Sequence, residues 1–276
     1  MSNFKDLVDD YVESEGVDQN ESTSTGTGFA PPPEGRGYAR VVEYIEIGSH
    51  YGMYQGKPKA KPDNLVRITL ELSGKLYPPI VAEDGTEYPQ RLSLELNLST
   101  NDKSRFYKLF RALNNMAGDK YKHFAQLAVD NFAFVVNIHH NASKKDANVK
   151  YANIWKDGAW QVSVAGTYNE EEEFIPSNVK PAMTPTRIFL FNKPTVETWA
   201  SLHIEGVRDD GSSKNWIQER ILNAVNYPNS QLEALLNELP DASTPSDEKP
   251  AAKAGKAPAA KAGAKGNAKA DALGEI

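Results

Sequence analysis

The sequence contains no cysteine. This absence excludes disulfides, thiolate nucleophiles and zinc sites built on thiolate ligands, and it agrees with a reducing compartment. No apolar run reaches the roughly 18 residues that a membrane-spanning helix needs. The N-terminal segment carries Asp6, Asp9 and Asp10 where a signal peptide would be basic. The sequence therefore predicts a soluble, cytoplasmic protein without a membrane partner.

Motifs of the common enzyme classes are also missing. There is no Gly-rich phosphate loop ending in Lys-Ser or Lys-Thr, no Gly-x-Ser-x-Gly elbow and no His-Glu-x-x-His motif. Acidic pairs such as Glu83-Asp84 lie in predicted loops, whereas a two-metal site needs preorganised ligands. His139 and His140 are neighbours in a predicted strand, so they point to opposite faces and do not readily bind one ion. We therefore predict a protein that is not an enzyme, without catalytic residues, metal or cofactor.

Charge is unevenly distributed along the chain. The whole sequence has 31 basic and 37 acidic residues, a formal net charge of −6. Residues 36–165 hold 18 basic and 13 acidic side chains, whereas residues 1–35 and 166–248 are acidic. A basic middle between acidic segments is expected when only the middle contacts a polyanion, although an ordinary soluble surface can carry a similar excess.

Both ends of the chain are poor in apolar residues. Residues 1–37 form an acidic leader rich in Ser, Thr, Gly and Pro, and residues 243–276 form a low-complexity tail of Ala, Lys, Gly and Pro. Such segments cannot offset the entropy of ordering by burial, so both are predicted to be disordered. The folded part is predicted to be a domain at 38–166 followed by an acidic extension at 167–242.

Hydrophobic periodicity predicts the elements of the domain. Residues 66–72 and 92–98 alternate apolar and polar side chains, which indicates half-buried strands, and an apolar-rich strand at 38–47 precedes them. The remaining predicted elements are a helix that is capped by Thr100 or Asn101 and ends at Gly118, a helical segment at 121–130, and strands at 132–140, 149–155 and, after a turn at Asp157-Gly158, 160–164. In the extension we predict a short strand at 187–191 and helices at 215–224 and 230–239.

The order of these elements predicts the fold. Three strands, a helix and two further strands are typical of the OB-fold, a five-stranded partly open barrel. The predicted class is therefore mainly β, with a five-stranded OB-type barrel and a helix between strands 3 and 4. Other small barrels and α+β sandwiches have the same order of elements and remain alternatives.

The connection between the first two strands is the first candidate binding segment, because OB-folds carry a main nucleic-acid-binding loop there. Lys57, Lys59 and Lys61 recur at every second residue in a proline-stiffened segment, which places their charges on one side to follow phosphates. Tyr51 and Tyr54 are expected to stack on bases. The alternative is a solvated basic loop that only aids solubility.

A second candidate segment follows the fourth strand, where an OB-fold has its other principal binding loop. If Ala152 and Ile154 face the core, the aromatic side chains between and beside them share the opposite face of the strand and form a stacking platform. The candidate residues here are Lys144, Lys145, Lys150, Tyr151 and Trp155. The alternative is that the acidic extension covers this face and both rings belong to the core.

Three arginines on the predicted strands complete the candidate DNA-binding residues. Arg40, Arg67 and Arg91 each lie on the polar side of their alternation. They either line one face of the barrel or are scattered surface charges.

The chain resembles the OB-fold single-stranded DNA-binding proteins of some bacteriophages. The similarity lies in the order of five segments: 39–48, 54–59, 65–72, 150–154 and 215–221. The resemblance implies sequence-tolerant binding of single-stranded DNA during phage DNA replication, recombination or repair, in the cytoplasm of an infected bacterium. Other phage replication or recombination proteins are the further partners that it implies.

Two other functions are consistent with the same residues. The chain departs from the family in its long acidic leader and its Ala/Lys-rich tail, and only residues 271–276 offer acidic and apolar side chains for recruiting a partner enzyme. In the first alternative, the protein is an interaction module of the phage replication machinery that does not contact DNA. In the second, it is a nuclease or another DNA-processing enzyme that requires a metal.

Overall fold

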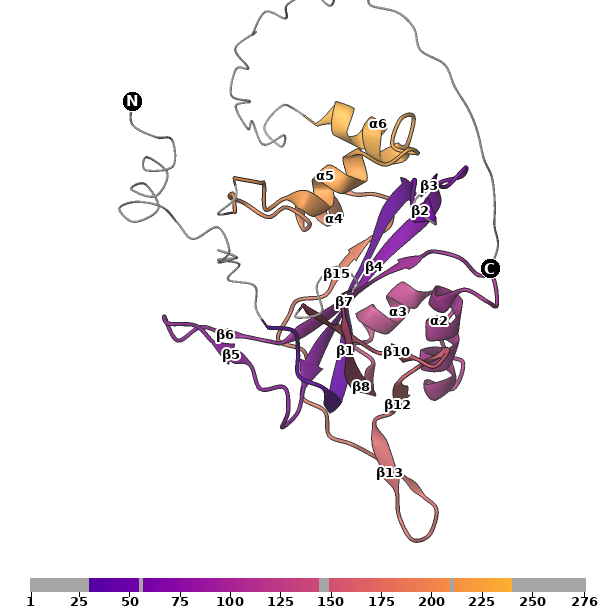
Figure 1. The fold of residues 1–276 in the computed structure, drawn as a ribbon, viewed down its shortest axis with the longest axis vertical. Helices are drawn as coiled ribbons and strands as arrows, with labels where there is room; N and C mark the ends of the chain where they lie inside the picture. Colours follow the sequence, from indigo (N-terminus) through magenta and orange to yellow (C-terminus); the bar gives the residue numbers. More distant parts are fainter. Residues whose placement is uncertain (1–29, 55–56, 144–148, 209–210, 240–276) are drawn as a thin grey trace, which may run out of the picture. The chain divides into compact units, whose positions relative to one another are not determined.

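A seven-stranded sheet forms the centre of the protein (Figure 1). The computed structural model describes residues 30–54, 57–143, 149–208 and 211–239. The strands of the central sheet are β1 (Gly35–His50), β4 (Asp63–Ser73), β7 (Arg91–Asn97), β8 (Ala133–Ala142), β9 (Lys150–Asn153), β12 (Val162–Val164) and β15 (Arg187–Phe189). All of their pairings are antiparallel except that of β15 with β1. The predicted mainly β class is confirmed.

The main path through the sheet has the strand order β12-β8-β1-β4-β7. Its strands β8, β1, β4 and β7 follow a Greek key, in which the fourth strand in the chain returns to lie beside the first. The two edge strands β7 and β12 both contact the helix α2 (Arg105–Met116). They do not pair with each other, so the described strands form an open sheet, and the predicted OB-type barrel is not confirmed.

Four two-stranded hairpins extend the connections between the long strands. The hairpins are β2 (Met53–Tyr54) with β3 (Lys57–Pro58), β5 (Ile80–Val81) with β6 (Glu87–Tyr88), β10 (Trp155–Lys156) with β11 (Ala159–Trp160), and β13 (Gly166–Tyr168) with β14 (Phe174–Pro176). The predicted turn at Asp157-Gly158 is confirmed in the third. Both residues have positive φ, 50° and 80°, as a two-residue type I′ turn requires.

Five helices accompany the sheet in the described residues: α2, α3 (Phe124–Val129), α4 (Val196–Ala200), α5 (Trp216–Leu222) and α6 (Gln231–Glu238). The predicted cap of α2 is wrong, because the N-cap is Ser104. Asn101 instead makes a turn before the helix. Its side chain accepts a hydrogen bond from the backbone N–H of Lys103 at 2.9 Å, and its carbonyl accepts one from that of Ser104 at 2.9 Å.

The first hydrophobic core lies between one face of the sheet and helices α2 and α3. The apolar residues of the predicted alternation in β4, among them Ile68 and Leu70, are fully buried there. Phe124 is central to this core: its ring stacks on Tyr44 of β1 and also contacts Phe106 and Phe110 of α2. This packing fixes α2 against the sheet.

The second core lies on the C-terminal half of β1. Ile45 and Ile47 pack there against Phe189 of β15 and against residues of α4, α5 and α6. β1 is therefore buried on both faces, which explains why its sequence is an apolar run and not a clean alternation. Register shifts between Val41 and Glu43, and between Glu46 and Gly48, interrupt the regular pairing of β1 with β4, as β-bulges do.

The predicted acidic extension joins this sheet directly. β15, at the predicted strand 187–191, pairs in parallel with residues Glu43 to Ile45 of β1, and Arg187 forms an ion pair with the buried Glu43. Helices α5 and α6 confirm the predicted helices 215–224 and 230–239, whereas α4 and the hairpin β13–β14 were not predicted. Residues 1–29 and 240–276, most of the predicted leader and all of the predicted tail, lie outside the described residues.

Candidate nucleic-acid interface

The segment between β1 and β4 begins with a hairpin, whereas the lysine spacing predicted a proline-stiffened segment with its three charges on one side. β2 pairs with β3, and the chain then bends at Ala60 and Lys61. The Lys59 ammonium is 2.5 Å from the Asp63 carboxylate, so its charge is compensated within the chain. Lys57 and Lys61 are exposed, and neither makes an ion pair with the described residues. The lysines therefore do not act as one row of three equal charges.

Aromatic residues accompany these lysines. Tyr51 is 59% exposed, and the backbone of Tyr54 lies in β2. The base of the hairpin is held by the extension, because the Asn226 side chain accepts a hydrogen bond from the Ser49 N–H at 2.8 Å. Val225 donates its N–H to the Ser49 carbonyl at 2.8 Å. Two hydrogen bonds thus fix the start of this basic and aromatic loop.

The second candidate segment is only partly as predicted. Lys144 and Lys145 lie outside the described residues, while Lys150 and Tyr151 are exposed in β9. The predicted continuous strand 149–155 is wrong, because β9 ends at Asn153. The side-chain oxygen of Asn153 accepts a hydrogen bond from the Trp155 N–H at 2.9 Å, a local turn that moves Trp155 into the separate hairpin β10–β11. Strand alternation therefore no longer places Tyr151 and Trp155 on one face.

Trp155 instead belongs to an aromatic and basic cluster at the start of α2. Its ring contacts that of Trp160 edge-on, with centroids 5.0 Å apart. The Arg105 guanidinium lies 4.9 Å from the Trp155 centroid, and the Lys108 ammonium lies 5.7 Å from it. The Trp160 indole N–H donates to the carbonyl of Arg105 at 2.8 Å, which ties the hairpin to the helix. We call these four residues the Trp155 cluster.

The two positive charges of the Trp155 cluster lie at an unfavourable position on α2. Arg105 and Lys108 lie in the first turns of α2, which has no acidic residue there. Cations at a helix N-terminus oppose the helix dipole, so the charges of these residues do not stabilise the helix through its dipole. Both are exposed, and neither is ion-paired within the part of the chain that the structure describes. The arrangement is suited to an anion that carries aromatic groups.

Sequence reasoning missed Arg105, Lys108 and Trp160. The available signal was two basic residues three apart at a helix start, which lie on one face of the helix. These residues contact Trp155 only because the chain turns at Asn153 and forms the hairpin β10–β11. Strand alternation does not predict this turn.

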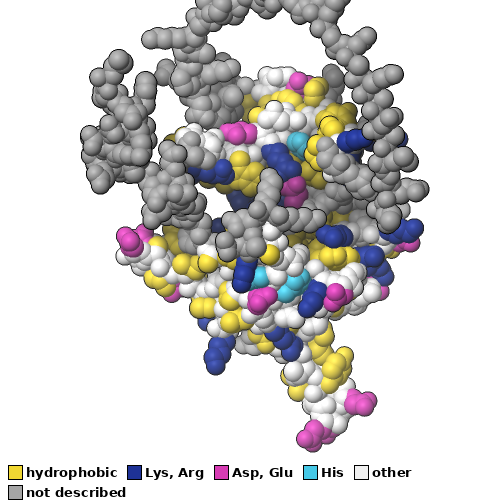
Figure 2. Space-filling view, in the orientation of Figure 1, with side chains coloured by type: hydrophobic (Ala, Val, Ile, Leu, Met, Phe, Trp, Pro, Cys, Tyr) yellow, Lys and Arg dark blue, Asp and Glu magenta, His cyan; other side chains and the backbone are white. Residues whose placement is uncertain are grey.

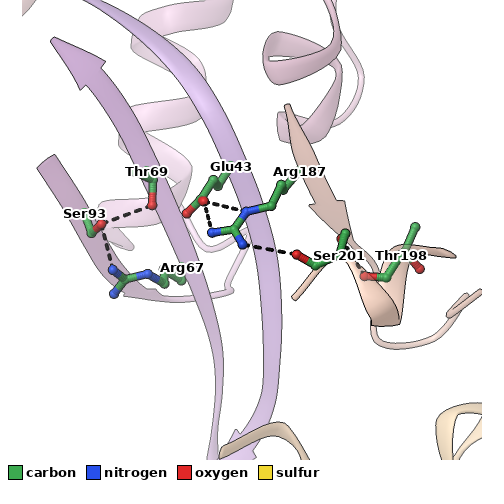
Figure 3. A network of polar contacts seen from close by, with 7 residues as sticks. All are labelled: Glu43, Arg67, Thr69, Ser93, Arg187, Thr198 and Ser201. Carbon is green, nitrogen blue, oxygen red and sulfur yellow. Dashed lines mark hydrogen bonds and ion pairs between the residues drawn. The ribbon is translucent and has the colours of Figure 1, made fainter. Parts of the chain in front are cut away.

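The opposite face of the sheet carries a polar network (Figure 3). Arg67 donates to the Ser93 hydroxyl at 2.8 Å, and its guanidinium lies 4.9 Å from the centroid of Trp216 on α5. Burial lowers the pKa of Arg67. Next to it, Arg187 donates to the buried Glu43 carboxylate and to the Ser201 carbonyl. Arg91 is exposed at the start of β7.

Arg40 lies on the predicted polar side of β1 but is directed at the chain itself. It donates to the backbone carbonyls of Lys180 at 2.8 Å, of Val179 at 2.7 Å, and of Asn131. The bonds to Lys180 and Val179 hold the extension against β1. The residue therefore has a structural role in this arrangement, and we leave it out of the proposed interface.

Lysine and arginine side chains do not form one continuous stripe on the face shown in Figure 2. They are separated by hydrophobic and acidic side chains, and acidic residues lie at the tip of the projecting hairpin β13–β14. A candidate interface is therefore identified by cations that accompany aromatic rings and not by charge alone.

Neither a metal centre nor a membrane span is found in the described ranges. No three His, Asp or Glu residues of those ranges are arranged to hold a metal ion. No helix among them is long and apolar enough to cross a membrane. Comparison of the chain with protein-family models, with curated proteins and with solved structures gives no match.

Proposed function

We propose that the protein binds single-stranded DNA without sequence preference and acts in phage DNA replication, recombination or repair. The observation that carries this proposal is the Trp155 cluster, in which two cations without ion-pair partners in the described residues lie over one indole ring. A single strand offers unpaired bases that stack on aromatic rings and phosphates that attract cations. In a duplex the faces of the bases are stacked on each other, so the same ring has little to contact.

The topology supports an OB-type fold for this function. The long strands follow a Greek key, with α2 and α3 between the third and the fourth. The segments 51–62 and 143–161 then correspond to the two loops that bind oligonucleotides in OB-folds, and β4 and β7 correspond to the strands of the binding face. Tyr51, Lys57, Lys61, Lys150 and Tyr151 lie in or beside these loops.

Sequence tolerance follows from the chemistry of these contacts. Every base has a π-face, so stacking on Trp155 does not select one base. Arg105 and Lys108 are point contacts to phosphate, which is the same in every nucleotide. The proposed interface therefore reads the single-stranded state and not the sequence.

A second candidate function is the docking of another replication or recombination protein. It is favoured by exposed apolar side chains on two hairpins, Val81 and Tyr88 on β5–β6 and Tyr168 and Ile175 on β13–β14. Salt separates the two functions, because phosphate contacts make the logarithm of the affinity fall steeply with the logarithm of the salt concentration. DNA binding without this dependence would contradict our proposal.

Replacing Trp155 by alanine is expected to weaken binding of oligo-dT by ~1–3 kcal/mol, because one stacking contact is lost. Addition of oligo-dT to the native protein should quench tryptophan fluorescence, and the variant should lose much of this quench. Trp155→Phe is the matched control, since it keeps a ring in place and should retain most of the affinity. A Trp155→Ala variant with native affinity and a lowered denaturant midpoint would mean that the ring belongs to the core.

Replacing Lys57 and Lys61 together by glutamine is expected to flatten the salt dependence of binding. Each lost phosphate contact lowers the log–log slope by up to ~0.7 for single strands. Lys59→Gln should change the slope less, because Lys59 is paired with Asp63. Lys75→Gln is the control for charge alone, since this exposed lysine lies just beyond the far end of β4. Equal slopes for the double variant and the native protein would exclude the hairpin from the interface.

A further inference from the structure

The acidic extension contributes an aromatic ring to the polar face of the sheet. Trp216 lies on α5, and part of its side chain packs on the second core while the rest remains accessible. Its ring meets the guanidinium of Arg67 at 4.9 Å. Arg220, one turn further along α5, forms an ion pair with Glu95 of β7 through two hydrogen bonds of 2.5 and 2.7 Å. The helix is thus fixed across β4 and β7 with its tryptophan over an arginine.

This ring lies on the other side of the sheet from the Trp155 cluster. Ile68 and Leu70 of β4 point into the core beneath α2, so Arg67 and Thr69 point to the opposite face. Arg105 and Lys108 belong to α2, whereas Trp216 contacts Arg67. No single stack of bases can therefore contact both tryptophans, because the sheet separates them.

The C-terminal end of β7 nevertheless connects the two sites in the chain. Arg67 pairs with Glu95 in the register of β4 and β7, two residues before β7 ends at Asn97. The chain then turns, with the Leu98 N–H bonded to the Asn64 carbonyl at 2.7 Å, and enters α2 at Arg105. β7 is an edge strand of the described sheet, so a polymer can pass around it from one face to the other.

We propose that Trp216 is a second stacking residue for the same single strand, which passes from the Trp155 cluster around β7 onto the face of Arg67 and Arg91. This inference rests on the proposed function. Arg67 is a positioning residue, because its guanidinium holds the indole and its Nη2 is bonded to Ser93. Arg91 is exposed and makes no ion pair with the described residues, so it supplies a cation for phosphate on this face.

The assignment predicts that the two tryptophans depend differently on the length of the ligand. The test uses oligo-dT of about 4 and about 16 nucleotides, the limits of site size for one OB-fold. Trp155→Ala should weaken both complexes. Trp216→Leu should weaken the longer complex by about 5- to 150-fold, as expected for one lost stacking contact, and leave the shorter one unchanged. Trp216→Phe should retain most of the affinity for the longer strand.

Tyr227→Leu is the matched control, because Tyr227 is another partly buried aromatic residue of the extension that packs on the second core. It should lower the denaturant midpoint as Trp216→Leu does, without a change in affinity for either strand. Equal weakening of both complexes by Trp216→Leu, or the same weakening by Tyr227→Leu, would overturn the inference and leave the proposed function in place. A native protein that binds neither strand would overturn the proposed function itself.

Discussion

Replacing Arg187 by methionine is expected to lower the free energy of unfolding by about 3–5 kcal/mol, the cost of leaving one partner of a buried ion pair alone. The Glu43 side chain is 3% exposed and has Arg187 as its ion-pair partner. Methionine fills a similar volume but leaves the carboxylate without its cation. Denaturant titration of the native protein and the variant measures the loss.

The pH dependence of the lost stability tests whether the isolated Glu43 carboxylate causes it. In the native protein, hydrogen bonds from Thr69 and Arg187 and the Arg187 charge outweigh burial and hold the pKa of Glu43 below its usual range. Its contribution to stability is therefore present above the ordinary glutamate pKa of ~4.3 and is lost as the pH falls through the lowered value. Without Arg187, burial raises the pKa, so the variant should lose stability as the pH rises through the raised value. The difference between the two proteins should shrink towards pH ~4.

The double variant Glu43→Gln, Arg187→Met is the control. Replacing a buried ion pair by neutral groups of similar size is often close to neutral, so the double variant should recover most of the stability. A double variant as unstable as Arg187→Met alone would show that the loss comes from the packing of the arginine and not from the isolated carboxylate.

Replacing Phe124 by alanine is expected to cost about 3–5 kcal/mol of stability, as for other buried phenylalanines. The side chain is 2% exposed, and its ring centroid lies 5.6 to 6.1 Å from those of Tyr44, Phe106 and Phe110. The cavity would remove the ring contacts through which α3 packs on both β1 and α2. Thermal or denaturant unfolding measures the effect.

Phe124→Leu is the matched control and should cost less, since it keeps most of the volume in the core. Because α2 carries Arg105 and Lys108, the folded fraction of Phe124→Ala should also bind oligo-dT more weakly than the native protein. An alanine variant as stable as the leucine variant would show that neighbouring side chains fill the space.

Local patterns predicted the elements that depend on local physics. The alternation at 66–72 and 92–98 gave β4 and β7, and Asp157-Gly158 gave the turn of the hairpin β10–β11. The helix start and the strand at 149–155 were wrong for one shared reason. Asn101 and Asn153 each accept a hydrogen bond from the N–H two residues later, which ends one conformation and starts another. In the sequence, an asparagine that makes such a turn looks the same as one that caps a helix or lies in a strand.

Other parts of the candidate site depend on distant residues. Arg40 meets carbonyls of Asn131, Val179 and Lys180, and nothing in the strand pattern around it indicates this. Arg67 lies on the polar face as predicted, but the tryptophan over it comes from the extension. Local periodicity places a side chain on a face, whereas the partner on that face is set by tertiary packing.

β1 belongs to both hydrophobic cores, and its pairings with other strands are expected to form in a fixed order during folding. Its pairing with β4 joins residues that are close in sequence, such as Ser49 and Asn64, whereas its pairing with β15 joins Glu43 to Arg187, 144 residues away. Contacts of such separation close late, because the entropy of the loop between them must be lost first. During synthesis, Ile45 and Ile47 in the C-terminal half of β1 therefore remain exposed to solvent until the extension has been made. This interval is when the chain is most open to wrong pairing with another copy or to the action of a chaperone.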